Sequence, residues 1–220
     1  MAGIYVHIPY CRKACTYCDF HFLTSRGSQG AMVAAIAREA ALRSDFFGAQ
    51  PAPLDTLYFG GGTPSVLSPA ELASLMEALR RHYSFHPEAE VTLEANPDDL
   101  SPAYLAALRK AGVNRLSVGI QSFRPEDLAA LNRSHTAAQA RDCLPAARAA
   151  GFEAVSLDLI FGLPGLDRQA WADNLGQALA LAPTHISVYA LTVEARTALA
   201  HQVEKGQVLL PEDEAFEAQY

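Results

Sequence analysis

Residues 4–18 read Ile4-Tyr-Val-His-Ile-Pro-Tyr-Cys11-Arg-Lys-Ala-Cys15-Thr-Tyr-Cys18, and they decide the fold, because a strand-like apolar run leads directly into three closely spaced cysteines. Three thiolates on so short a loop can each bind a different iron of a cubane cluster, which leaves the fourth iron open to a substrate. A structural zinc site normally has four protein ligands. We therefore predict that Cys11, Cys15 and Cys18 hold a [4Fe-4S] cluster.

Two further residues bear on this metal site. His21 follows the loop closely and could complete a zinc site with the three cysteines, since zinc accepts both residue types. The fourth cysteine, Cys143, falls far along the chain within a predicted helix, where a thiol behaves as a small apolar residue. We expect Cys143 to be buried and to bind no metal.

Composition indicates a folded protein that binds no nucleic acid and has no membrane span. The chain has 220 residues, of which 50% are apolar and 19% charged, enough for one large domain or two small ones. Its net charge of −7 makes it a poor binder of phosphate backbones, which need clustered Lys and Arg. It starts without a secretion signal and has no run of about 18 apolar residues. We expect a cytoplasmic protein without a membrane span, where structural disulfides are rare.

Short apolar runs alternate with longer helical segments along the chain. Strands separated by helices need crossover connections and pair in parallel. Six such units predict an α/β fold, either a partial (β/α)6 barrel or an open sheet. The pattern weakens near the C-terminus, so we expect a core over 1–193, then a linker and the start of a truncated C-terminal domain over 194–220. Strands are expected at 4–8, 54–59, 91–94, 115–121, 154–161 and 184–190, and helices at 29–47, 69–82, 102–110, 125–132, 136–150 and 168–181.

Further polar or flexible residues fall at the carboxyl ends of these strands, where parallel α/β folds bind their ligands. Gly60-Gly-Gly-Thr-Pro64 follows the second strand. Its glycines allow a ligand close to the backbone, although a tight turn explains them equally well. Glu94, Gln121 and Asp158 lie on the next three strands. A carboxylate in apolar surroundings needs a partner, which a ligand, a salt bridge or a cap could supply.

Taken in order, these motifs resemble the radical S-adenosylmethionine superfamily, whose signature is a CxxxCxxC loop after the first barrel strand. The likeness extends to one subfamily, which contains oxygen-independent coproporphyrinogen III oxidases and heme chaperones, and it covers nearly the whole chain. It is carried by Tyr5-Val-His-Ile-Pro9, the cysteine loop, Phe59-Gly-Gly-Gly-Thr-Pro64, Glu94-Ala-Asn-Pro97, Gly119-Ile-Gln-Ser-Phe123, Leu131-Asn-Arg133 and Asp158-Leu-Ile-Phe-Gly-Leu-Pro164.

The resemblance implies a partial (β/α)6 barrel that binds S-adenosylmethionine (SAM) beside the cluster, whose electron cleaves the S–C5′ bond of SAM. A physically sensible division assigns Arg133 to the methionyl carboxylate and Glu94 to the ammonium, with Gln121 and Asp158 on the ribose hydroxyls. The resemblance implies Cys11, Cys15 and Cys18 as metal ligands and, as cofactor-binding residues, Tyr5, Tyr17, Gly61, Gly62, Thr63, Glu94, Gln121, Arg133, Asp158 and Thr192.

Phe20 separates the two branches of the subfamily. The oxidase pattern continues CxxxCxxCxC, and here Phe20 stands where the oxidases have the fourth cysteine. This favours a heme chaperone that delivers heme to respiratory proteins over an oxidase that decarboxylates coproporphyrinogen III, and it leaves open whether the chain is an enzyme. The implied partners are SAM, heme or a porphyrin, an electron donor and respiratory heme acceptors. Heme binding is expected to need the C-terminal domain that this chain lacks.

Overall fold

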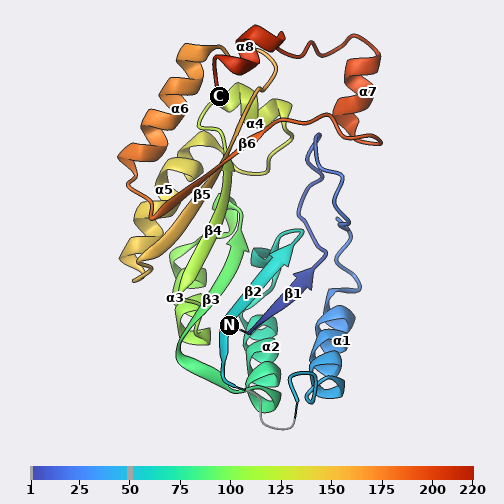
Figure 1. Cartoon of the computed structure of the whole chain (residues 1–220), viewed down its shortest axis with the longest axis vertical. Helices are drawn as coiled ribbons and strands as arrows, with labels where there is room; N and C mark the ends of the chain where they lie inside the picture. The colour runs from blue at the N-terminus through green and yellow to red at the C-terminus, as the bar shows by residue number, and fades with distance from the viewer. Residues whose placement is uncertain (1, 49–51) are drawn as a thin grey trace.

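A single parallel sheet forms the centre of the protein, in the computed structural model, which describes residues 2–48 and 52–220. Its six strands lie in chain order, each paired in parallel with its successor. β1 and β6 are the two edges, so the sheet is a partial barrel that does not close (Figure 1). The strands are β1 (Gly3–Ile8), β2 (Leu54–Gly61), β3 (Phe85–Ala95), β4 (Arg115–Gln121), β5 (Ala154–Phe161) and β6 (His185–Ala190).

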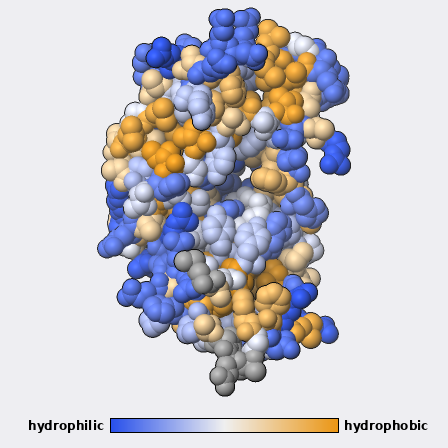
Figure 2. All heavy atoms as spheres, viewed as in Figure 1, coloured by the Kyte–Doolittle hydropathy of each residue, from blue (hydrophilic) through white to orange (hydrophobic). Residues whose placement is uncertain are grey.

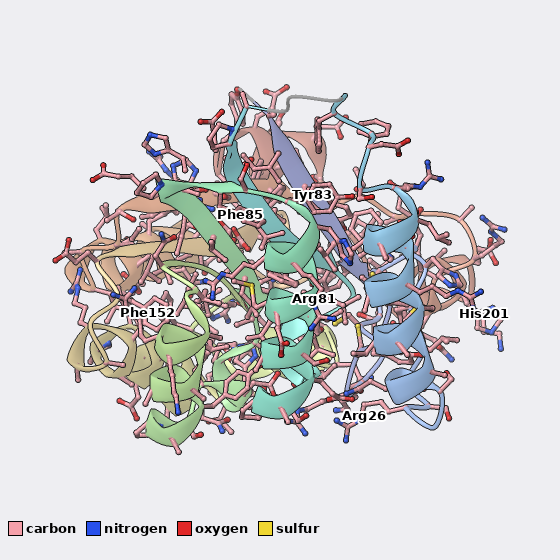
Figure 3. All side chains as sticks on the ribbon, turned by 90° about the horizontal axis from the view of Figure 1, so that it is seen from below. Arg26, Arg81, Tyr83, Phe85, Phe152 and His201 are labelled. Atoms are coloured by element: carbon pink, nitrogen blue, oxygen red, sulfur yellow. The ribbon has the colours of Figure 1, made fainter. Side chains whose placement is uncertain are left out.

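Helices cover one face of this sheet. Because every strand neighbours the next strand along the chain, right-handed crossovers all step in the same direction and place their helices on the same side. α1 packs against α2 and α2 against α3, and Figure 3 shows these three helices side by side. The helices are α1 (Gln29–Leu42), α2 (Pro69–His82), α3 (Pro102–Ala111), α4 (Pro125–Ala130), α5 (Ala137–Ala149), α6 (Arg168–Ala180), α7 (Ala198–Glu204) and α8 (Asp213–Glu217), with 3₁₀ turns at Pro64–Val66 and Pro97–Asp99.

Helix α2 illustrates how the sequence forms this layer. The Ser68 side chain accepts a hydrogen bond from the Glu71 backbone, and the Glu71 carboxylate accepts one from the Ser68 backbone, so two unpaired N–H groups of the first turn are satisfied. Helical spacing then buries one stripe of the helix against the sheet. Its buried residues are Leu72, Leu75, Met76 and Leu79.

The core lies between the helices and the sheet. Phe59, Leu93, Leu116 and Leu157 come from four neighbouring strands, and each is fully buried. At the open edge the packing is looser: Val188 of β6 stays partly exposed, and Figure 2 shows apolar surface near β6 and α6. None of the described helices is both long and apolar enough to cross a membrane.

The expected α/β fold is confirmed, and the element boundaries differ in a few informative places. The helix expected to reach residue 47 ends at Leu42, before a turn that leads to Gly48 at φ 91°. The third strand begins at Phe85 rather than at residue 91. Its early part contains Pro87 and pairs irregularly with β2, because proline cannot donate to the ladder, which is why the sequence pattern missed it. Helix α7 was not predicted.

One buried polar network fastens α6 to the loop after β4. Asn174 is fully buried, and its Oδ1 accepts a hydrogen bond of 2.8 Å from the Phe123 backbone. Its Nδ2 donates to the Ser122 hydroxyl at 3.1 Å, and that hydroxyl donates to Asp127 at 2.6 Å. The network therefore satisfies a backbone N–H group that has no access to water.

Replacing Asn174 by Ala is expected to lower the free energy of unfolding by about 1–3 kcal/mol, because the Phe123 N–H group would stay buried without a partner. Urea denaturation followed by circular dichroism measures the change. Asp173→Ala, one residue earlier on the exposed side of α6, is the control and should change stability by less than about 0.5 kcal/mol. Equal effects of the two substitutions would contradict the role given to this network.

Candidate cofactor site

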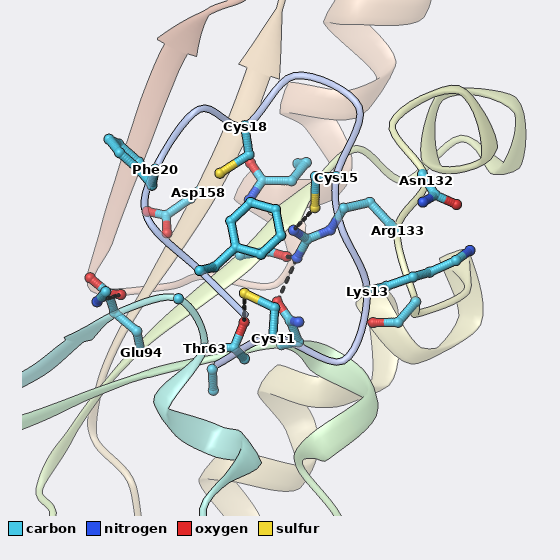
Figure 4. A pocket seen from close by; sticks show the side chains of 18 of the residues that line it. Cys11, Lys13, Cys15, Cys18, Phe20, Thr63, Glu94, Asn132, Arg133 and Asp158 are labelled. Carbon is cyan, nitrogen blue, oxygen red and sulfur yellow. Dashed lines mark hydrogen bonds between the residues drawn. The ribbon is translucent and has the colours of Figure 1, made fainter. Parts of the chain in front are cut away.

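A pocket of about 210 Å³ opens at the carboxyl ends of the strands and gathers most of the residues expected to bind the cofactors (Figure 4). Its walls come from the cysteine loop after β1, the glycine turn after β2, the ends of β3 and β4, and the α4–α5 loop. The expected residues that line it are Cys11, Cys15, Tyr17, Cys18, Gly61, Gly62, Thr63, Glu94, Gln121, Arg133 and Asp158. Residues distant in sequence are therefore brought together as predicted.

Hydrogen bonds to the backbone of the cysteine loop hold the loop in place from two sides. On one side, the Thr16 N–H donates to the carbonyl of Leu131 at 3.2 Å, and the Asn132 side chain donates to the Ala14 carbonyl at 2.6 Å. On the other side, the Leu199 N–H at the start of α7 donates to the Thr16 carbonyl at 2.8 Å. The spacing of the three cysteines is thus fixed by contacts that do not use the thiols.

Two of the three thiols receive hydrogen bonds from the pocket wall. The Thr63 hydroxyl lies 3.4 Å from the Cys11 sulfur, and the Arg133 guanidinium 3.3 Å from the Cys15 sulfur (Figure 4). Burial raises the pKa of the Cys11 thiol, which the Thr63 hydrogen bond partly offsets. Burial also raises the pKa of Cys18. These donors point at the sulfurs, where they would stabilise a deprotonated thiolate.

Cys143 is buried, as expected. It is buried on α5, its thiol lies 3.2 Å from the carbonyl oxygen of Ala140, and burial raises its pKa to about 12. It lines none of the pocket, so its thiol does not contribute to the site.

His21 does not line the pocket with the three cysteines, which weakens the zinc alternative. Within residues 2–48 and 52–220, no three His, Cys, Asp or Glu side chains are arranged to chelate one metal ion. His21, which in the zinc alternative would complete the site, lines a different groove beside β1 and α1. A cubane instead spreads its three thiolates over three irons.

The glycine turn packs directly against the start of the cysteine loop. A Cβ atom on Gly62 would lie 2.8 Å from the Tyr10 carbonyl oxygen and 3.0 Å from the Cys11 sulfur, so only glycine fits there. Gly61 has a φ of 115°, which favours glycine as well. Close packing of the turn on the Tyr10 backbone is therefore enough to require glycine at position 62.

The two carboxylates of the pocket are half-buried and accept hydrogen bonds from neutral donors. The Tyr58 hydroxyl donates to Glu94 at 2.7 Å, and the Gly61 N–H donates to Glu94 at 3.2 Å. The Ser117 hydroxyl lies 3.4 Å from Asp158. Burial raises the pKa of both carboxyl groups. Neither of them forms a salt bridge with another residue in the part of the chain that the structure describes. The structural ion pair considered from sequence is therefore not formed.

Gln121 reaches the pocket through an irregular backbone. It has a φ of 68°, and the pairing of β4 with β5 shifts between Gly119 and Gln121. Left-handed φ values in residues other than glycine cost about 1–3 kcal/mol and concentrate at functional sites. A Cβ on Gly119 would lie 2.8 Å from Nε2 of the Gln121 side chain, so glycine at position 119 makes room for that side chain.

Asn96 is a site residue that the sequence analysis did not single out. Its side-chain oxygen accepts a hydrogen bond of 2.6 Å from Arg133, which also donates to the Gly119 carbonyl at 2.7 Å. Arg133 Nε is buried and has no partner within the described residues, so one donor remains for a ligand. Asn96 follows Glu94 by two positions near a strand end, and side chains two apart share a face, which is the signal that could have identified it.

Two of the residues expected to bind the cofactor, Tyr5 and Thr192, do not line the pocket. Tyr5 is 57% exposed, stacks on Tyr58 with ring centroids 6.0 Å apart, and shares a hydrogen bond with His7. It touches the site indirectly, because Tyr58 donates to Glu94. Thr192 is exposed on the segment between β6 and α7.

The family follows from the comparison with known proteins. The model of the radical SAM superfamily matches residues 5–176, which include the cysteine loop, the glycine turn and the polar residues of β3, β4 and β5. The chain belongs to the radical SAM superfamily. Membership implies a [4Fe-4S] cluster and SAM.

Named relatives narrow the comparison further. Heme chaperone HemW of Mycobacterium tuberculosis is 38% identical over 222 residues, covering 99% of this chain and 56% of that protein. Radical S-adenosyl methionine domain-containing protein 1, mitochondrial, of Mus musculus is 38% identical over 220 residues, covering 100% of this chain and 49% of that protein. The structure of coproporphyrinogen III oxidase (HemN) from Escherichia coli, a radical SAM enzyme, superposes with a TM-score of 0.87 at 30% identity. The match covers 99% of this chain and 50% of the HemN chain. The chain spans about half the length of the proteins it matches.

Replacing Cys11, Cys15 or Cys18 by Ser is expected to abolish the visible absorption of an anaerobically reconstituted cluster, because each thiolate would hold a different iron. Cys143→Ser is the matched control and should leave the absorption unchanged, since that thiol is buried in α5. Loss of the cluster in Cys143→Ser would contradict the three-ligand site.

Proposed function

We propose that this chain is the cofactor-binding core of a heme chaperone that delivers heme to respiratory proteins. The observation that carries the proposal is the 38% identity to HemW over 99% of the chain, together with Phe20 in place of the fourth cysteine of the oxidase pattern. Phe20 is 73% exposed and lines the mouth of the pocket (Figure 4). We also propose that residues 1–193 form this core and that 194–220 lead into a C-terminal domain.

In this proposal Cys11, Cys15 and Cys18 hold the cluster, and the remaining pocket residues bind SAM. Glu94 would take the ammonium of SAM, and Gln121 and Asp158 the ribose hydroxyls. Arg133 would use Nε, its free donor, for the methionyl carboxylate. Gly61, Gly62 and Thr63 would border the methionyl end, and Tyr5, Tyr17 and Thr192 complete the proposed set.

When bound, the cluster supplies one electron to SAM. The chain's own part is to orient SAM and to keep water out of the pocket. Burial already raises the pKa of Glu94 and of Asp158, because an ionised carboxylate is poorly solvated there. A cationic ligand would offset that cost, and SAM carries both an ammonium and a sulfonium charge.

An oxygen-independent coproporphyrinogen III oxidase is the second candidate. Its specific support is the superposition with HemN at a TM-score of 0.87. Phe20 weighs against it, since the fourth cysteine is missing from the loop. The proposal further includes a cytoplasmic location, an unidentified electron donor and respiratory proteins as heme acceptors.

Glu94→Gln is expected to weaken SAM binding about ten- to a hundredfold, because a charge-assisted hydrogen bond contributes roughly 1.5–3 kcal/mol. The cluster should persist, since Glu94 is not among its proposed ligands. Calorimetric titration of SAM into the cluster-loaded protein measures the change. Glu90→Gln, the same substitution on an exposed position of β3, should bind SAM normally. Unchanged affinity in Glu94→Gln would remove Glu94 from the site.

Spectroscopic titration of the full-length protein with heme tests the proposed function. We expect stoichiometric heme binding with a shifted Soret band and no conversion of coproporphyrinogen III to protoporphyrinogen IX in the presence of SAM and a reductant. Decarboxylation without heme binding would favour the oxidase instead.

A further inference from the structure

Two hydrogen-bond donors in the pocket are directed at sulfur atoms. The Thr63 hydroxyl contacts the Cys11 sulfur at 3.4 Å, and Arg133 Nη1 contacts the Cys15 sulfur at 3.3 Å. Thr63 is buried, so water does not compete for its hydroxyl. Figure 4 shows both contacts, one on either side of the space between the thiols. Neither contact is needed to bind SAM, whose charged groups have other partners in the proposed site.

Arg133 is fixed in this position by neighbours that use its other terminal nitrogen. Nη2 donates to the Asn96 side chain at 2.6 Å and to the Gly119 carbonyl at 2.7 Å. A Cβ on Gly119 would approach Nη2 to 3.3 Å, so glycine leaves the space that the guanidinium occupies. The preceding residue, Asn132, has a φ of 55° and donates to the Ala14 carbonyl of the cysteine loop. The guanidinium is thus oriented before any ligand arrives.

A donor or a positive charge beside a ligand sulfur favours the reduced form of an iron–sulfur cluster. Reduction by one electron adds a negative charge, and hydrogen bonds to the sulfurs, net charge and solvent exposure set the potential. Charges interact more strongly in a buried site than in water. We propose that Arg133, positioned by Asn96, and Thr63 raise the reduction potential of the cluster through their bonds to Cys15 and Cys11. This inference rests on the cluster assigned under the proposed function.

A redox titration monitored by electron paramagnetic resonance tests the inference on the full-length protein, reconstituted anaerobically and without SAM. Dithionite and mediator dyes supply the electrons, and iron and sulfide analysis first establishes the cluster content. Arg133→Gln should lower the equilibrium constant for one-electron reduction at least tenfold, a shift of about 59 mV to more negative potential. Thr63→Val, which removes only the hydroxyl, should shift it in the same direction by less.

Lys13→Gln is the matched control. Lys13 also lines the pocket, but it is exposed on the cysteine loop, and the structure describes no bond from it to a cysteine sulfur. Its replacement removes the same charge as Arg133→Gln and should leave the potential close to that of the unmodified protein, because water screens an exposed charge.

The outcomes separate this inference from the proposed function. An unmodified protein that takes up no iron and sulfide would overturn the cluster assignment itself. Cluster-loaded Arg133→Gln and Thr63→Val with unchanged potentials would overturn the inference alone, as would an equally large shift in Lys13→Gln. If Arg133→Gln takes up no cluster, Asn96→Ala and Thr63→Val decide: lower potentials in both support the inference, and an unchanged potential in either overturns it.

Discussion

The parallel pairing of each strand with its successor is the constraint on which the site depends. All strands therefore run in the same direction. The segments that follow β1, β2, β3, β4 and β5 all begin at the same side of the sheet, where the carboxyl ends of the strands lie. The cysteine loop, the glycine turn and the polar residues Glu94, Gln121 and Asp158 meet there for that reason. The buried leucines of the strands and helices belong to one hydrophobic core, on which these strands are packed.

The pocket combines ionisable groups that would each be unfavourable to bury alone. Three thiols, two carboxylates and one guanidinium line the same pocket, in a chain whose net charge is −7. Glu94 and Asp158 are held by neutral donors and have raised pKa values. Arg115 offsets part of the cost of burial for Asp158 electrostatically, and a cationic ligand would offset more of it for both carboxylates. A cluster that takes the thiolates and a cationic cofactor that faces the carboxylates would resolve both problems together.

Sequence patterns predicted the fold and most of the site for identifiable reasons. The cysteine spacing is local, and the strand ends converge once the sheet is known to be parallel, so Cys11, Glu94 and Asp158 could be placed in one pocket without a structure. The spacing of Asn96 from Glu94 indicates only that both side chains face the pocket, because the role of Asn96 depends on a contact with Arg133, a residue 37 positions away. The αL conformation of Gln121 and the start of β3 at Phe85 were also beyond the pattern, since tertiary packing decides both.

The central claim is that three cysteines hold a four-iron cluster whose remaining iron is open to SAM. Mössbauer spectroscopy of the full-length protein, loaded with isotopically enriched iron and measured with and without SAM, tests it most directly. SAM is expected to change the signal of one iron site and to leave the other three unchanged. A spectrum that SAM does not alter, from a cluster with four equivalent irons, would contradict it.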